Sequence, residues 1–112
     1  MGCVFCKILK GKIPSKPIYE DENVFAFFDI NPQAPVHVLF IPKIHIDSAN
    51  LVTEENSHYI KSIFEAIPKA AKQLDISSYR IITNCGKDAG QTVEHLHFHL
   101  LAGVQMQEGL LK

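Results

Sequence analysis

Apolar and polar residues alternate with two different periods along the 112-residue chain, and each period predicts a different kind of element. Runs rich in β-branched and aromatic residues, bounded by turn-forming residues, are typical of strands. The chain has five of them: PIYED (17–21), NVFAFFD (23–29), VHVLFIPK (36–43), YRIITNC (79–85) and HLHFHLLA (95–102). A tight polar turn at 21–23 joins the first two, and a glycine-containing loop, NCGKDAGQT (84–92), precedes the fifth.

Helical spacing occurs in two places. CVFCKILK (3–10) predicts a short helix that ends before Gly11 and Pro14. A longer helix is expected from Thr53, a good N-cap residue, and Pro68 should kink it or cut it short. Its apolar stripe consists of Tyr59, Ile60, Ile63, Phe64, Ile67, Ala71 and Leu74. Strands joined by short turns, with one long helix inserted, predict an α+β fold with an antiparallel sheet in a single domain spanning 1–112.

Composition narrows the function classes. The chain is 46% hydrophobic and 21% charged, and 11 basic against 12 acidic residues give a net charge of −1. This balance argues against nonspecific binding to nucleic acid or to a membrane surface, and no apolar run is long enough to span a bilayer. Three cysteines are too few for a disulfide scaffold, so we expect a reducing, cytoplasmic setting, with Cys85 as a buried small apolar residue.

The stretch HLHFHL (95–100) carries histidine at every second position. On a strand, His95, His97 and His99 would share one face, about 6.5–7 Å apart, and the intervening apolar residues would face the core. Such a row could simply be a solvated face, or two of the histidines could join a third ligand on a catalytic zinc. A neutral histidine can also attack phosphorus and form a covalent intermediate, with amides of the glycine loop stabilising the phosphoryl oxygens.

The pattern HxHxHxx, with apolar residues at x, resembles the signature of the histidine triad (HIT) superfamily. Three ordered stretches resemble its HINT branch: FCKILKGKIPSKPIYED, AFFDINPQAPVHVLFIPKIHI and NCGKDAGQTVEHLHFHLLAG. The resemblance implies a five-stranded antiparallel sheet with a short N-terminal helix and one long helix. It also implies a homodimer in which two such sheets pair into a ten-stranded sheet, which would hide an exposed edge.

The resemblance implies a nucleoside phosphoramidase, an enzyme that cleaves a P–N bond and releases a purine nucleotide of the AMP or GMP type and an amine. His97 would be the nucleophile, His99 would orient and stabilise the phosphate, and His37 would support the triad. Asp29 would accept hydrogen bonds from the ribose hydroxyls, although an aspartate before Asn-Pro also suits a turn. The positions that match the base pocket are Val4, Phe5, Ile8, Phe27 and Ile30, and those that match the phosphate loop are Asn84, Gly90, Gln91 and Thr92. Dinucleotide fingerprints are absent, so no organic cofactor is expected.

Cys3 and Cys6 form a CxxC pair, which alone is a weak signal for metal or redox chemistry. In some bacterial HIT proteins this pair joins two histidines on a structural zinc, and the matching positions are His45 and His95. The resemblance therefore implies a Cys2His2 zinc site.

Two alternatives remain open at this stage. One is a hydrolase of dinucleoside polyphosphates such as Ap4A, as in the Fhit branch, which usually has glutamine after the third histidine. The other is a noncatalytic nucleotide-binding protein. The C-terminal segment VQMQEGLLK lacks the tryptophan-containing ending of animal HINT proteins, which puts the preference for a leaving amine or base in doubt.

Overall fold

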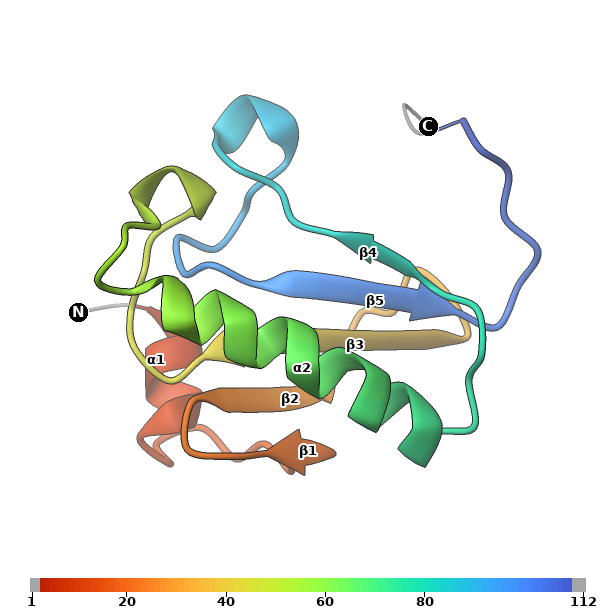
Figure 1. Cartoon of the computed structure of the whole chain (residues 1–112), viewed down its shortest axis with the longest axis horizontal. Helices are drawn as coiled ribbons and strands as arrows, with labels where there is room; N and C mark the ends of the chain where they lie inside the picture. Colours follow the sequence, from red (N-terminus) through yellow and green to blue (C-terminus); the bar gives the residue numbers. More distant parts are fainter. Residues whose placement is uncertain (1–2, 110–112) are drawn as a thin grey trace.

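The computed structural model describes residues 3–109, so the outermost residues of the predicted 1–112 domain lie outside it. Two α-helices accompany five strands in the chain order of Figure 1. The helices are α1 (Val4–Leu9) and α2 (Ser57–Gln73), and short 3-10 turns lie at η1 (Ala49–Leu51) and η2 (Lys87–Ala89). The strands are β1 (Tyr19–Glu20), β2 (Val24–Phe28), β3 (Val36–Pro42), β4 (Arg80–Ile82) and β5 (Phe98–Ala102).

The strands form one sheet in the order β1-β2-β3-β5-β4, and every neighbouring pair is antiparallel. The predicted α+β fold with a five-stranded antiparallel sheet and two helices is therefore confirmed. The crossover through α2 places β5 between β3 and β4, so that Leu39 pairs with His99 and His37 with Leu101. This register sets His37 and His99 diagonally on one face, within reach of each other.

Apolar residues cover both faces of the sheet. Helix α2 lies across one face (Figure 1), where Ile63 and Ile67 pack with inward residues of the strands such as Phe40 and Leu100. On the opposite face, Phe5 of α1 joins a smaller cluster formed by Phe25, Phe27, Leu39 and Ile41. Burial on both sides explains why β2 and β3 are almost continuously apolar in sequence.

Helix α2 differs from its prediction at both points that the sequence raised. It begins at Ser57, not just after Thr53, because the side chain of Asn56 folds back and accepts a hydrogen bond from the Thr53 N–H at 2.7 Å. That contact holds 53–56 in a separate turn. Pro68 does not end the helix, which continues to Gln73. Pro68 is exposed, and the tertiary packing of Ile63, Ala66, Ile67 and Ala70 outweighs the lost backbone hydrogen bond.

The fifth strand is shorter than predicted. Strand β5 begins at Phe98, so His95 and His97 lie in the extended segment before it, and only His99 lies within the strand. Here the chain leaves the sheet and the Leu96 N–H donates instead to the Ile46 carbonyl at 2.6 Å. The alternation survives nevertheless, since Leu96 packs into the same core cluster as Phe98.

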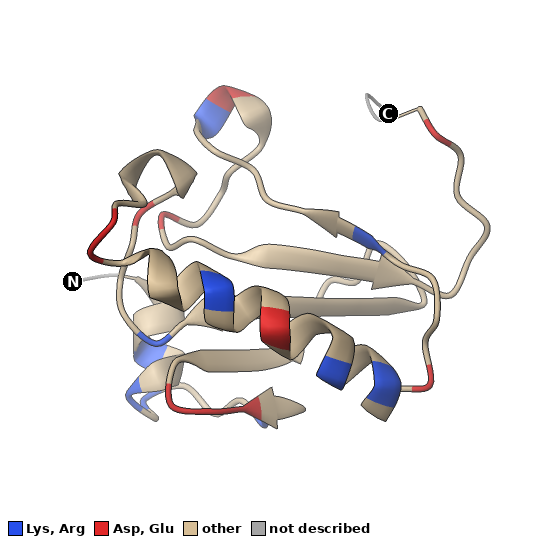
Figure 2. Ribbon diagram, in the orientation of Figure 1, with Lys and Arg blue, Asp and Glu red and all other residues tan. Residues whose placement is uncertain are grey.

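Charged residues lie in the helices, the loops and the edge strands β1 and β4, whereas β2, β3 and β5 contain no Lys, Arg, Asp or Glu (Figure 2). On α2 the two signs are interspersed, for example in the Lys61–Glu65 ion pair at 2.8 Å. Neither helix in residues 3–109 combines the length and apolar character that a membrane crossing requires.

Candidate active site and metal centre

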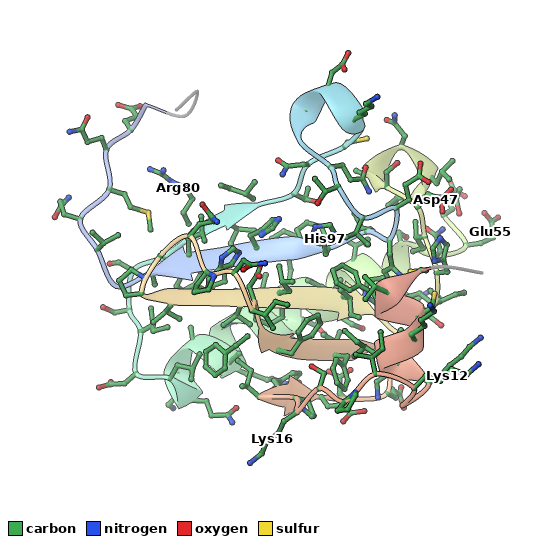
Figure 3. All side chains as sticks on the ribbon, turned by 180° about the vertical axis from the view of Figure 1, so that it is seen from behind. Lys12, Lys16, Asp47, Glu55, Arg80 and His97 are labelled. Atoms are coloured by element: carbon green, nitrogen blue, oxygen red, sulfur yellow. The ribbon has the colours of Figure 1, made fainter. Side chains whose placement is uncertain are left out.

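A cleft of about 590 Å³ opens on the face of the sheet that α1 covers. It is lined by the three histidines that the sequence analysis expected to act on the phosphate, His37, His97 and His99. Figure 3 views the molecule from behind and shows His97 close to β5 on this face. Predicted nucleotide-binding residues also line the cleft: Val4, Phe5, Ile8, Phe27, Asp29, Ile30, Gly90 and Thr92. The structure thus brings together residues from α1, β2, β3, the glycine loop and β5.

His97 is held in one orientation and one tautomer. Its Nδ1 lies 2.7 Å from the backbone carbonyl oxygen of His95, and a carbonyl can only accept, so Nδ1 carries the proton. The imidazole is buried, and it meets the edge of Phe5 with ring centroids 5.1 Å apart. Its Nε2 therefore keeps a free lone pair, which is what a nucleophile requires.

His37 and His99 form a directed chain of hydrogen bonds. The backbone N–H of Gln33 donates to His37 Nδ1 at 3.0 Å, which places the proton of His37 on Nε2. His37 Nε2 lies 2.8 Å from His99 Nδ1, so His37 donates and His99 accepts there. His99 consequently carries its proton on Nε2. The backbone amide of Gln33 thus acts through His37 to fix the proton of His99 on Nε2. His99 is therefore a hydrogen-bond donor in the same cleft in which His97 has a free lone pair.

Burial keeps His37 and His99 neutral. It lowers the pKa of His99 to about 4, and the neighbouring His97 and His37 act in the same direction while Asp29 partly opposes them. The pKa of His37 is also lowered, again chiefly by burial. Both rings are therefore neutral at physiological pH, which the hydrogen-bond chain requires.

The pKa of His99 makes the stability of the fold pH-dependent. In the unfolded chain histidine titrates near 6.5, so below that pH protons favour the unfolded state. The contribution of neutral His99 to the free energy of unfolding is therefore fully present above about pH 6.5 and is lost as the pH falls toward 4. We expect the free energy of unfolding of the His99→Gln variant to fall less than that of the wild type over this range. The difference should be about 1–2 kcal/mol, discounted for partial exposure of the ring, and urea unfolding at several pH values measures it. Equal slopes for the two proteins would contradict the assignment.

Asp29 uses its two carboxylate oxygens differently. Oδ1 accepts from the Asn31 N–H at 2.8 Å, which forms the turn that the Asn-Pro sequence suggested. Oδ2 lies 3.4 Å from His37 Nε2, at the wall of the cleft. The turn role and a ligand role are therefore compatible in one side chain.

Asp29, His37 and His99 also lie close enough together to be considered as metal ligands. The hydrogen-bond chain argues against that use. Since His37 Nδ1 already accepts from Gln33, a metal on Nε2 would require His37 to lose its remaining proton and become an imidazolate. The arrangement favours proton positioning over metal binding.

A second cluster joins the two cysteines of α1 to two histidines. Cys3, Cys6, His45 and His95 each offer one ligand atom, and these atoms all lie within 4.8 Å of one another. Cys3 Sγ is 3.3 Å from His95 Nδ1, and Cys6 Sγ is 3.2 Å from His45 Nδ1. Two thiols and two imidazoles at these separations are a donor set suited to a tetrahedral metal. The four residues named from the sequence therefore form a group that can hold a metal ion.

The hydrogen bonds around the cluster orient both imidazoles toward the cysteines. His45 Nε2 lies 2.5 Å from Asp47 Oδ1, and His95 Nε2 lies 3.2 Å from the Pro42 carbonyl. Each acceptor fixes the ring proton on Nε2 and leaves the Nδ1 lone pair for a metal. This carboxylate or carbonyl partner is the usual companion of a metal-binding histidine.

Several contributors were missed in the sequence. Asp47, two residues after His45, could have been noticed from its spacing, whereas Gln33 and Pro42 act through backbone atoms and give no side-chain signal. Two predicted loop residues, Asn84 and Gln91, do not line the cleft. The Asn84 amide lies against Gly90, at a φ of +95° that favours glycine. Cys85 is half-buried rather than fully buried, because β4 ends at Ile82 and the chain returns to the surface.

Comparisons with known proteins identify relatives of this chain in sequence and in fold. A family model described as "Scavenger mRNA decapping enzyme C-term binding" matches residues 2–111. A HIT-like protein of Buchnera aphidicola is 43% identical over 107 residues, covering 94% of this chain and 96% of the relative. Among solved structures, a HIT family hydrolase from Clostridium thermocellum has a TM-score of 0.95 and 54% identity, covering 98% of this chain and 97% of its own. A histidine triad protein from Clostridium difficile has a TM-score of 0.92 and 44% identity, with coverage of 98% and 97%.

Proposed function

The chain belongs to the histidine triad (HIT) family, and from this membership we propose that it is a nucleotide hydrolase, specifically a nucleoside 5′-phosphoramidase. The observation that carries the proposal is the pairing of opposite roles in one cleft. His97 presents a free lone pair on Nε2, and His99 presents an N–H on Nε2. A phosphoryl-transfer site needs both a nucleophile and a donor for the phosphoryl oxygens or the leaving group.

In the proposed reaction, Nε2 of His97 attacks the α-phosphorus of a nucleoside phosphoramidate. The N–P bond to the histidine forms as the P–N bond of the substrate breaks, and the departing nitrogen takes a proton from the solvent and leaves as the amine. Water then attacks the same phosphorus and loses a proton to the solvent, so that the nucleotide is released and the electron pair of the N–P bond returns to His97. The hydrogen bond from Nδ1 to the His95 carbonyl stabilises the positive charge that the ring carries as the bond forms.

The walls of the cleft suit a purine nucleoside monophosphate of the AMP or GMP type. Asp29 directs an oxygen toward the cleft, where an ionised carboxylate can accept from ribose hydroxyls. Apolar side chains of Val4, Phe5, Ile8, Phe27 and Ile30 offer contacts to a base, and Ile30 is 91% exposed at the mouth of the cleft. Gly90 and Thr92 also line the cleft. The Thr92 hydroxyl can donate to a phosphate, whereas the Gly90 N–H already donates to the Lys87 carbonyl at 3.0 Å.

Hydrolysis of two substrates tests the activity. We expect purified protein to release AMP from adenosine 5′-phosphoramidate at least tenfold faster than from Ap4A at equal concentration. Chromatographic measurement of AMP gives both rates. A preference for Ap4A would assign the chain to the dinucleoside polyphosphate hydrolases instead. Bound AMP without turnover of either compound would indicate a nucleotide-binding protein.

We also propose that the metal of the Cys3, Cys6, His45 and His95 cluster is zinc in a structural site. The donor set and the oriented imidazoles support this assignment, and four protein ligands leave no open position for a substrate. When bound, the ion would cross-link α1 to the segments that carry His45 and His95. It would take no part in the reaction. Cys3, Cys6 and Cys85 form no disulfide with one another, which suits a reducing cytoplasm.

A homodimer is the expected assembly, formed by pairing of the β4 edges. Strand β4 lies at one end of the sheet order, and exposed apolar residues lie near it, with Tyr79 36% and Val104 57% exposed. A three-residue edge strand with apolar neighbours is a surface that pairing would cover.

Sedimentation velocity should therefore give twice the mass of one chain, and a Tyr79→Lys substitution in this surface should shift the protein toward the monomer. A monomeric wild-type protein at micromolar concentration would refute the assembly.

A further inference from the structure

The side chain of Gln91 makes an unusually complete set of hydrogen bonds for a loop residue. Its Oε1 accepts from the Gly86 N–H at 2.9 Å. Its Nε2 donates to the carbonyls of Asp47 at 2.7 Å and of Val93 at 2.9 Å. Both amide protons and the oxygen are thereby used inside the protein. Gln91 has no free donor left for a ligand, and it does not line the cleft.

These contacts close the loop 86–90 upon itself and attach it to another part of the chain. The Gln91 backbone N–H also donates to the Gly86 carbonyl, at 3.1 Å, so both ends of the loop are joined. Gly90, the last residue of the loop, and Thr92, which follows Gln91, line the same cleft as the histidines. The segment to which it is attached is the one in which Asp47 orients His45, and Figure 3 labels Asp47 on this side of the molecule.

We propose that Gln91 is a positioning residue, which fixes the loop 86–90 so that Gly90 and Thr92 meet the phosphate of a nucleotide at the right distance from His97. The inference rests on the proposed function, because it assigns the phosphate to this side of the cleft. It differs from the sequence-based expectation, in which Gln91 itself contacts the ligand. The position of the loop depends on one side-chain amide that reaches across 44 residues of sequence.

A glutamate at position 91 tests the hydrogen bonds of the side chain without changing its length. Gln91→Glu keeps the length of the side chain, but a carboxylate has no proton for the carbonyls of Asp47 and Val93 and would repel both. Gln105→Glu makes the same chemical change on an exposed residue whose amide, within residues 3–109, donates a single hydrogen bond, to the neighbouring Met106 carbonyl. That variant is the matched control for the added charge.

Two measurements on the full-length, metal-loaded proteins test the inference. The first is amide hydrogen exchange of residues 86–91, which reports loop order whether or not the protein is an enzyme. We expect exchange to be at least tenfold faster in Gln91→Glu than in the wild type or in Gln105→Glu. The second is calorimetric binding of AMP and of adenosine. We expect Gln91→Glu to weaken AMP binding about tenfold and to change adenosine binding less than twofold, because only AMP carries the phosphate.

The outcomes separate this inference from the proposed activity. Unchanged exchange of residues 86–91 in Gln91→Glu would overturn the inference even in an active enzyme. Equal weakening of AMP and adenosine would also overturn it, since that result indicates general damage to the cleft. Faster exchange with selective loss of AMP binding would support it, even in a protein that binds nucleotides without hydrolysing phosphoramidates.

Discussion

His97→Ala is expected to abolish turnover of adenosine 5′-phosphoramidate, with kcat reduced by roughly 10⁴-fold or more. The effect is large because, among the cleft residues that the structure describes, His97 alone has a ring nitrogen whose lone pair is free, and the hydrogen bond from its other ring nitrogen to the His95 carbonyl holds it in place. His99 cannot replace it, since its proton lies on the nitrogen that faces away from His37. Water would then have to attack phosphorus without a covalent intermediate.

Three measurements make this prediction specific. AMP binding by His97→Ala should remain within about tenfold of the wild type, because the ribose and base contacts do not involve that ring. His58→Ala, at an exposed histidine on α2 that stacks on Tyr59, should keep full activity. Rapid quenching of the wild type should yield a nucleotidyl group on the peptide that contains His97. Substantial turnover by a correctly folded His97→Ala variant would refute the nucleophile assignment.

The double substitution Cys3→Ser and Cys6→Ser is expected to remove the metal and to lower the melting temperature by roughly 10–20 °C. A structural zinc site contributes its binding free energy to folding, and a loss of a few kcal/mol in a domain of this size shifts the melting temperature by that amount. Helix α1 has only six residues, from Val4 to Leu9, and apart from this cluster it is held on the sheet by Phe5, Ile8 and Leu9. Its loosening should also expose the base side of the cleft, which Val4, Phe5 and Ile8 line.

Metal analysis of the purified proteins gives the first test, with about one zinc per chain in the wild type and little in the double variant. Cys85→Ser is the matched control, because Cys85 is half-buried and belongs to neither cluster. A hollow of about 450 Å³ lined by Cys3, His45 and Asp47 opens beside the site, so a chelator should reproduce the effect on the wild type. Equal metal content in the wild type and the double variant would exclude the assignment.

The architecture of this chain was predictable because its strand and helix periods are strong. The alternation in HLHFHL correctly separated the histidines from the core residues Leu96 and Phe98, although two of the three histidines precede the strand. The local pattern could not show that other parts of the chain compete for the backbone N–H groups near the ends of these elements. The Leu96 N–H bonds to Ile46, and the Asn56 side chain bonds to Thr53, and these contacts move the starts of β5 and α2.

The site was predictable to the extent that its chemistry resides in side chains with a recognisable spacing. The four candidate metal ligands lie close enough together to hold an ion, and the histidines of the cleft line one pocket, as their motifs implied. The tautomers of His37, His97 and His99 were not predictable, because they depend on the Gln33 amide and the His95 carbonyl, and every residue has such groups. Gln91 was named correctly as a loop residue, but only the folded structure shows that its amide is turned away from the cleft.

His95 takes part in both clusters through different atoms, and this division has an evolutionary consequence. Its imidazole faces the cysteines and the Pro42 carbonyl, whereas only its backbone oxygen contacts His97. A lineage could therefore exchange the His95 side chain, and lose Cys3, Cys6 and His45 with it, without depriving the nucleophile of its acceptor. The candidate metal centre and the proposed reaction are thus separable traits on one fold.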